Sequence, residues 1–300
     1  IIMYSDIFII FNPVSTGGHA EAKAGRLAER LRKRGLTSLH VQGTDYPGHA
    51  EALAYQDCLA SNRPLIVSVS GDGGYNEVVN GVMRAKNEDA SRQPVCAILP
   101  AGNANDHRRS VRKRPLTWAI THAQSEPMDL LKLTVKKDSY KQVRYAHSYI
   151  GAGFTSHAAA QLKDESLSAF KEIAIVARAI FSFHPVAIST IDGKTRSYDS
   201  LIFANIHHMS KFMRLGDKAD INNGSFRLSV LPHRSDFWLL RIFLNFWLFV
   251  FGLKKLPQQT SYQFSVPRSE SIHLDGELFQ LPGGATVDVT MAPASLPVIR

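Results

Sequence analysis

Apolar and polar positions alternate with two different periods along the first third of the chain. Ile7 to Phe11 is a continuous apolar run typical of a buried strand, and the polar turn Asn12 to Gly18 follows it. In the next segment, small and apolar residues repeat with the spacing of one helix face: Ala24, Leu27, Ala28 and Leu31. Further strands are expected at 39–41, 65–69 and 95–99, and further helices at 49–59 and 77–84. Strands separated by helices predict an α/β, doubly wound domain, in which helices cover both faces of a mainly parallel sheet.

The hydrophobic pattern changes near Thr117, where short alternating runs begin to dominate. These runs predict strands at 130–135, 143–150, 200–204, 226–231, 262–266, 271–274 and 287–291. Helical stretches interrupt them near Phe154 to Phe181 and Phe237 to Leu253. We therefore predict an α/β domain over residues 1–115 and a β-rich domain over residues 116–300. The C-terminal end of the chain is free to pack back onto the first domain.

The net charge and the cysteine content limit the classes of binding partner and the cellular location that we expect. The chain carries a net charge of +9 and has a sequence pI near 9.6, which favours nucleotides, nucleic acid or an anionic membrane surface. No nucleic-acid-binding module is recognisable, so we expect no nucleic acid partner. Cys58 and Cys96 are too few for a disulfide framework, which predicts reduced, buried thiols and a cytoplasmic location.

The most informative stretch is the glycine-rich turn Gly71-Asp72-Gly73-Gly74, which follows a predicted strand and precedes a predicted helix. Glycines let backbone N–H groups approach a phosphate, and the helix N-terminus favours an anion there. An acidic residue in such a turn repels phosphate unless Mg²⁺ lies between them, so Asp72 indicates a metal–nucleotide complex. The spacing fits neither the dinucleotide fingerprint nor a P-loop. The alternative is an ordinary strand-to-helix turn.

A second turn of the same kind, Leu99 to Asp106, also follows a strand and also carries Gly, Asn and Asp. Loops at the carboxyl ends of parallel strands converge on one crevice. We therefore expect the loops 12–18, 71–76 and 102–106 to lie together.

Four motifs of the chain resemble those of the diacylglycerol kinase catalytic domain family, which includes bacterial lipid kinases and sphingosine kinases. They are Asn12-Pro13-Val14-Ser15, Gly71 to Glu77, Leu99 to Asp106 and Asp275-Gly276-Glu277. The resemblance implies that the N-terminal domain binds ATP with Mg²⁺ and that a β-sandwich-like C-terminal domain carries the lipid site. The nucleotide contacts that it implies are Asn12, Pro13, Ser15, Thr16, Thr44, Gly71, Asp72, Gly73, Gly74, Asn76, Glu77, Gly102, Asn103, Asn105 and Asp106.

Four departures from the family motifs stand out. Ser70 replaces the first glycine of the first signature, and Gly74 and Asn103 replace the two signature threonines. Asn222-Asn223-Gly224 stands where the family often has Asp-Asp-Gly and a structural Mg²⁺. Asn223 is the position that corresponds to the structural metal site. For Mg²⁺ at the phosphates, the candidate ligand is Asp72 of the glycine-rich turn.

The resemblance also implies the catalytic residues. Phosphoryl transfer to an alcohol needs a base for the hydroxyl proton, and Glu277 matches the family's base. Asp275 points to the same side as Glu277 if the segment is extended, whereas taken alone Asp-Gly is typical of a hairpin turn. Asp106 and Asp129 are expected to support the site.

The apolar segment Phe237 to Leu253 allows two interpretations. A spanning helix needs about 20 apolar residues, and Arg241 and Asn245 interrupt this one, which favours a core helix of the second domain. The alternative is a helix that docks on the bilayer, with the basic run 108–114 as a further membrane contact. The expected partners are a membrane lipid substrate and an anionic membrane surface, reached by peripheral association, with a homodimer as a further possibility.

Three functions follow from these residues. The first is an ATP- and Mg²⁺-dependent lipid kinase acting on the hydroxyl of diacylglycerol or a similar lipid. The second is a nucleotide- or lipid-binding protein of the same fold with weak or no kinase activity, in line with the four departures. The third is a relative with a soluble substrate, such as an NAD kinase, which shares the Gly-Asp-Gly turn.

Overall fold

The computed structural model describes residues 4–15, 17–102, 105–111, 114–122, 125–156, 184–206, 208–209, 213–214, 222–233, 254–255 and 257–299. The chain divides into two compact units. The first unit comprises Ile1–Asp129 and Pro293–Arg300, and the second comprises Leu130–Ala292. The division falls at Asp129, beyond the predicted domain boundary between residues 115 and 116, because helix α5 (Leu116–Thr121) packs into the core of the first unit.

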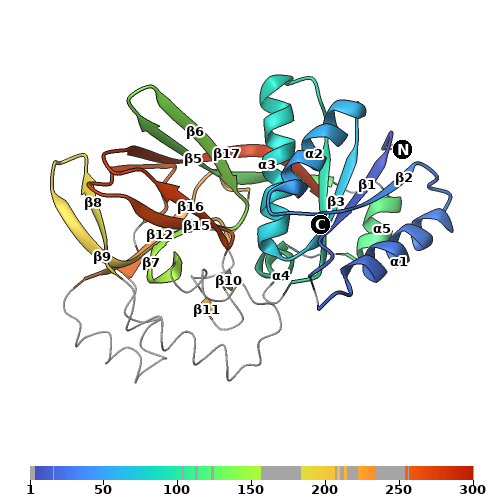
Figure 1. The fold of residues 1–300 in the computed structure, drawn as a ribbon, viewed down its shortest axis with the longest axis horizontal. Coiled ribbons are helices and arrows are strands. Elements are labelled where there is room, and N and C mark those ends of the chain that lie inside the picture. The colour runs from blue at the N-terminus through green and yellow to red at the C-terminus, as the bar shows by residue number, and fades with distance from the viewer. Residues whose placement is uncertain are drawn as a thin grey trace. The chain divides into compact units, whose positions relative to one another are not determined.

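The first unit is a parallel sheet with the strand order β4-β3-β1-β2 (Figure 1). Val298, near the C-terminus, extends this sheet by pairing in parallel with Cys96 of β4. Besides α5, the strands and helices of this unit are β1 (Ile7–Phe11), α1 (Ala20–Arg32), β2 (Leu39–Gly43), α2 (His49–Ala60), β3 (Leu65–Ser70), α3 (Asp72–Glu88), β4 (Val95–Pro100) and α4 (Asp106–Val111).

Helices cover both faces of this sheet because its strands are apolar on both sides. Ile7, Ile9 and Phe11 of β1 share a core with α1 and α5. Phe8 and Ile10, on the opposite face of the same strand, are also buried, and α2 and α3 pack on that side (Figure 1). The predicted doubly wound α/β domain is confirmed.

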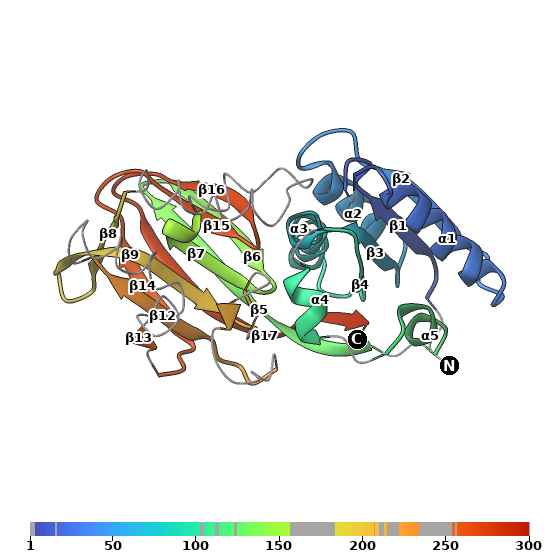
Figure 2. The same ribbon diagram turned by 90° about the horizontal axis from the view of Figure 1, so that it is seen from below.

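The second unit is β-rich, as predicted (Figure 2). Its main sheet runs β16-β15-β7-β9-β8-β14-β17, with β12 beside β9 and β13, and β5 beside β17 and β6. The strands are β5 (Ser125–Lys137), β6 (Tyr140–Ala146), β7 (Tyr149–Gly153), β8 (Val186–Thr190), β9 (Thr195–Ala204), β12 (Arg227–Pro232), β13 (Lys254–Lys255), β14 (Ser261–Ser265), β15 (Glu270–Leu274), β16 (Glu277–Leu281) and β17 (Thr286–Ile299), with β10 (His208–Met209) and β11 (Met213–Arg214) as a separate pair.

Several elements and boundaries differ from the sequence predictions. The run 143–150 is two strands rather than one, because the chain turns between Ala146 and Tyr149. Helix α3 begins at Asp72, five residues earlier than position 77, so the glycine turn forms its first turn. Among the elements that were not predicted are strands β8 and β16 and helices α4 and α5.

Both predicted apolar helices lie largely or wholly outside the described residues, the first beyond residue 156 and the second over 237–253. Within the described part of the chain, no helix is long and apolar enough to cross a membrane. Cys58 and Cys96 are buried and unbridged, which confirms the prediction for the thiols.

One buried carboxylate of the first unit yields a pH-dependent prediction. Asp57 on α2 is 5% exposed, and it accepts one hydrogen bond, of 3.3 Å, from the Gln42 amide. Its other oxygen, Oδ2, is buried with no hydrogen-bond partner in the structure as described. Burial raises the pKa of Asp57 from 3.8 to about 6. Between these two values the folded state binds more protons, so this group's contribution to stability falls as the pH rises.

We expect Asp57→Asn to stabilise the protein at pH 8 by roughly 2 kcal/mol, because the buried charge is removed. At pH 4 the carboxyl is protonated in the folded state and about half protonated in the unfolded state, so most of the gain should disappear. Urea denaturation of both proteins at pH 8 and pH 4 measures this difference. An equal gain at both pH values would show that the charge is not the cause.

Candidate functional site

The carboxyl ends of four parallel strands lie level at one edge of the first unit. Phe11 of β1 pairs with Gly43 and with Val69, and Ser70 pairs with Pro100. The next residues of each strand are joined to the neighbouring strand by backbone bonds: Thr44 N to Phe11 O at 3.0 Å, Asn12 N to Val69 O at 3.3 Å and Ala101 N to Ser70 O at 2.9 Å. The three turns predicted to converge therefore share this edge with Thr44.

Two of these turns touch through their backbones at Gly71 and Gly102. A β-carbon on Gly102 would lie 2.4 Å from the Cα of Gly71, and one on Gly71 would lie 3.1 Å from the Cα of Gly102. Asn105 closes the second turn: its amide accepts from Gly102 N at 3.0 Å and donates to Gly102 O at 2.6 Å. The backbones of the two turns therefore meet, without intervening side chains, beside the N-terminus of α3. Exposed backbone N–H groups at a helix N-terminus are suited to binding an anion.

Asp72, the first residue of α3, caps the neighbouring helix α4. Its two carboxylate oxygens accept hydrogen bonds from Asp106 N at 2.9 Å and His107 N at 3.1 Å. These are the first N–H groups of α4, which have no acceptor within their own helix. Asp72 is thus a structural tie between the two glycine turns, in addition to any role toward a metal.

Glu77, also on α3, makes equivalent hydrogen bonds to the start of helix α2. Its carboxylate accepts from Gly48 N at 2.9 Å and Ala50 N at 3.2 Å, at the start of α2. The first turns of α3 therefore anchor the starts of both α2 and α4. Together, the carboxylates of Asp72 and Glu77 fix the relative positions of the loops that precede α2, α3 and α4.

We expect Asp72→Asn to destabilise this edge. An asparagine presents an NH₂ group to one of the two backbone N–H donors, which leaves a buried polar group unpaired at a cost of about 1–3 kcal/mol. Thermal unfolding should show a lower midpoint, together with weaker nucleotide binding. Asp89→Asn is the control, because Asp89 makes similar bonds to Ser91 in an exposed turn. An unchanged midpoint for Asp72→Asn would contradict the capping role.

Other implied nucleotide contacts are held inside the unit. Asn76 is buried, and its side-chain oxygen accepts from the amide of Asn80 at 3.0 Å. Ser15 and Asp106 are buried as well, whereas Pro13 is exposed. Half-buried positions at the edge itself are Asn12, Thr44, Gly71, Gly73, Gly74, Gly102 and Asn105. Thr16 and Asn103 lie outside the described residues.

The two implied catalytic residues belong to the second unit. Asp275 and Gly276 form the two-residue turn of the β15–β16 hairpin, since Leu274 pairs with Glu277 and both turn residues have positive φ, +52° and +98°. The segment is not extended, so the idea that extension places Asp275 and Glu277 on one side is wrong. Glu277 is half-buried at the start of β16.

Asp275 is enclosed and 1% exposed. Its carboxylate accepts three backbone hydrogen bonds from the turn between β6 and β7: from His147 N at 2.8 Å, and from Ser148 N and Tyr149 N at 2.9 Å each. The Nε2 atom of His147 lies 3.3 Å from the same carboxylate. Asp275 therefore positions the hairpin that carries Glu277, and it also explains why the predicted run 143–150 breaks at His147.

Among the described residues, no group of three or more His, Cys, Asp or Glu side chains could hold a metal. Asn223 is exposed, and its side-chain oxygen accepts from Ser225 N at 3.0 Å and Ser225 Oγ at 2.9 Å, which closes a turn. Mg²⁺ commonly binds one or two carboxylates and takes its other ligands from phosphates and water. The residues at the carboxyl ends of β1, β3 and β4 fit this pattern better than they fit a metal site made of protein ligands alone.

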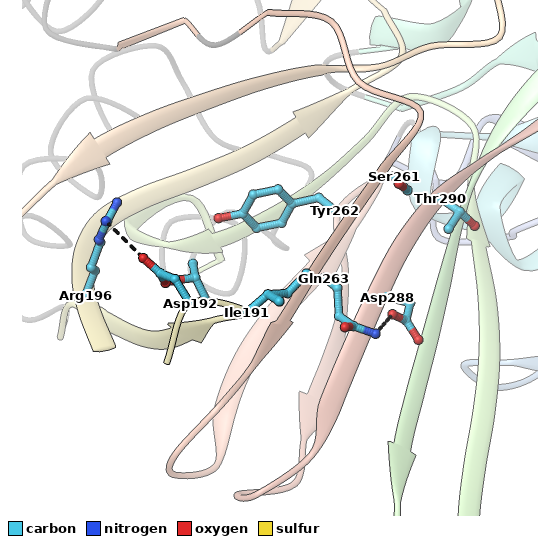
Figure 3. Close-up of a pocket in the computed structure, with 9 residues that line it drawn as sticks. Ile191, Asp192, Arg196, Ser261, Tyr262, Gln263, Asp288 and Thr290 are labelled. Carbon is cyan, nitrogen blue, oxygen red and sulfur yellow. Dashed lines mark hydrogen bonds and ion pairs between the residues drawn. The ribbon is translucent and has the colours of Figure 1, made fainter. Parts of the chain in front are cut away.

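A separate pocket of about 540 Å³ lies on the second unit, between the β8–β9 hairpin and strands β14 and β17 (Figure 3). Its charged groups already pair with neighbours: Arg196 with Asp192 at 3.7 Å, and the Gln263 amide with Asp288 (Figure 3). It contains none of the motif residues. We do not assign it a ligand.

Three residues that bond to the motifs inside the first unit were not foreseen in that role from the sequence: Gly48, His107 and Ser70. The first two contribute backbone N–H groups, which leave no side-chain signal. Ser70 was visible only as a departure from the family pattern.

Residues 6–133 match the family model of the diacylglycerol kinase catalytic domain. A Bacillus subtilis protein named "Putative lipid kinase YtlR" is 24% identical over 263 residues, which span 78% of this chain and 80% of that protein. Human mitochondrial acylglycerol kinase is 24% identical over 139 residues, 43% of this chain and 32% of the relative.

Solved structures show the same fold over the whole chain. A diacylglycerol kinase from Bacillus anthracis strain Sterne superposes with a TM-score of 0.69 at 16% identity, covering 100% of this chain and 98% of that one. Yeast NADH kinase in complex with NADH gives a TM-score of 0.52 at 13% identity, over 99% of this chain and 83% of that one, a more distant likeness of fold. The match over residues 6–133 confirms the resemblance to the diacylglycerol kinase catalytic domain family that the sequence motifs carry.

Proposed function

We propose that this protein is an ATP- and Mg²⁺-dependent lipid kinase that phosphorylates the hydroxyl of diacylglycerol or a similar lipid. The observation that supports it most is the backbone contact between Gly71 and Gly102, which brings two glycine turns together at the N-terminus of α3. Such an edge suits a polyphosphate. The family match and the relatives named as lipid kinases support the same reaction class.

The roles follow from chemistry at named groups. Backbone N–H groups of the turns at Gly71–Gly74 and Gly102 would hold the phosphates, and Asp72 would be the carboxylate ligand of Mg²⁺. ATP supplies the phosphoryl group, whose charge the metal and the N–H groups offset. Glu277 accepts the proton of the attacking lipid hydroxyl. Asp275 holds the hairpin of Glu277 in place through its three backbone bonds.

A membrane-bound substrate implies peripheral contact with an anionic surface. Within the basic run 108–114, Arg108 is buried and donates to Arg114 O at 3.2 Å, so it is unsuited to headgroups. Arg109 and Arg114 are exposed and are the better candidates. Co-sedimentation with anionic and with neutral vesicles tests this contact: binding that is equal for both kinds of vesicle would contradict it.

The second candidate function is a binding protein with weak or no kinase activity. It is favoured by one observation: both oxygens of Asp72 already accept backbone hydrogen bonds. Incubation with labelled ATP, Mg²⁺ and a panel of diacylglycerol, monoacylglycerol, sphingoid base and NAD separates the candidates. A labelled phospholipid supports the lipid kinase, transfer to NAD alone supports a soluble-substrate kinase, and nucleotide binding without transfer supports the binding protein.

A further inference from the structure

Gly74 on α3 and Ser70 at the end of β3 compete for one volume. A β-carbon on Gly74 would lie 2.7 Å from the Cβ of Ser70 and 2.8 Å from its Oγ. Real β-carbon contacts are essentially never shorter than 3.0 Å. Residue 74 can therefore carry a side chain only if residue 70 gives up its own or the strand end moves.

We propose that residues 70 and 74 form one functional unit, in which Ser70 positions the phosphate turn with a hydroxyl supplied from the strand end instead of from the helix. The motif that this chain resembles has glycine at position 70 and threonine at position 74, and here the hydroxyl-bearing residue stands at 70 and the glycine at 74. The two departures thus compensate each other in the same space. This inference rests on the proposed function.

Ser70 acts on the turn directly, through a hydrogen bond of its own hydroxyl group. Its Oγ donates to the Gly71 carbonyl at 3.0 Å and lies 2.7 Å from the Oγ of Ser68. A hydroxyl has one proton to donate, so Ser68 is the donor to Ser70. Both serines are buried, 1% and 3% exposed.

The carbonyl of Gly71 is the group that sets the direction of the turn. It also accepts the N–H of Tyr75 at 3.1 Å, the first hydrogen bond of α3. Because the peptide unit is planar and trans, fixing this carbonyl also fixes the opposite direction of the Asp72 N–H. The N–H groups of the first helical turn have no acceptor within the helix, so they are the donors available to a phosphate. Ser70 is therefore a positioning residue that acts through Gly71 and does not itself touch the phosphate.

The test compares four proteins: wild type, Ser70→Gly, Gly74→Thr and the double variant Ser70→Gly/Gly74→Thr. Affinity for Mg·ADP is measured by calorimetry, and urea denaturation without nucleotide gives the stability of each. We expect Gly74→Thr to weaken nucleotide binding about tenfold or more and to lower stability, because its side chain collides with Ser70. Ser70→Gly should weaken binding several-fold. The double variant should bind within about threefold of wild type.

Ser70→Ala and Ser68→Ala separate positioning from packing. Ser70→Ala keeps the β-carbon but loses the bond to Gly71, so it should raise the KM for ATP while kcat changes little. Ser68→Ala removes an equally buried hydroxyl that does not touch the turn, and it should leave that KM near the wild-type value.

The inference is overturned if wild type binds Mg·ADP but the double variant binds no better than Gly74→Thr. It is also overturned if Ser70→Ala and Ser68→Ala change KM equally. If wild type binds no nucleotide, the proposed function fails and the positioning role fails with it. The stability coupling between positions 70 and 74 is then still decided by the denaturation data.

Discussion

Replacing Glu277 by glutamine is expected to lower kcat for lipid phosphorylation by about 10²–10⁴, the usual contribution of a general base. Glutamine keeps the shape of the side chain and its hydrogen-bonding capacity, but it cannot take a proton at neutral pH. Affinity for nucleotide should change by less than about twofold, because the proposed role of Glu277 is toward the lipid hydroxyl and not toward the phosphates. A turnover assay with saturating ATP, paired with calorimetric binding of Mg·ADP, measures both effects.

Glu270→Gln provides the matched control for that experiment. Glu270 lies on the same hairpin as Glu277, at its other end opposite Leu281, and accepts from Arg268 at 3.0 Å. The same substitution there alters the charge of the hairpin but not the proposed base, so turnover should stay near the wild-type value. Equal losses for the two variants would assign the effect to the hairpin's charge rather than to proton transfer, and full activity of Glu277→Gln would exclude it as the base.

Periodicity predicted most of the first unit because its elements are long and their environments uniform. Strand β1 is buried at every position, and the buried face of α1 contains all four residues that the helical spacing selects. The boundaries failed where a side chain from elsewhere in the chain decides the backbone path. The break between β6 and β7 depends on Asp275, which is more than a hundred residues away in the sequence.

The site was predictable as a place but not as a set of roles. Alternation of strands and helices is enough to bring the loops after β1, β3 and β4 to one edge. The bonding of Asp72 and Glu77 to the starts of α4 and α2 was not foreseeable, because their partners are backbone N–H groups that any sequence supplies. A motif of charged residues therefore marks where a site lies before it shows whether each charge faces a ligand or the protein.

The buried carboxylate of Asp275 should contribute measurably to stability. Three backbone N–H groups depend on its carboxylate, and all belong to one buried turn at His147, Ser148 and Tyr149. Asparagine has one oxygen acceptor in place of two and presents an NH₂ group to donors. Leaving a buried N–H donor without an acceptor costs about 1–3 kcal/mol, so Asp275→Asn should lower the free energy of unfolding by about that amount.

The backbone conformation makes this substitution a clean test of the carboxylate. Asparagine, like the aspartate that it replaces, tolerates the positive φ of +52° at residue 275, so turn strain adds little. Asp138 is the matched control, because it has φ +51° in the exposed turn of the β5–β6 hairpin. Urea denaturation should show a large loss for Asp275→Asn and less than about 0.5 kcal/mol for Asp138→Asn. If both variants unfold like the wild type, the three hydrogen bonds contribute little, and Asp275 must be re-examined as a group that acts on substrate.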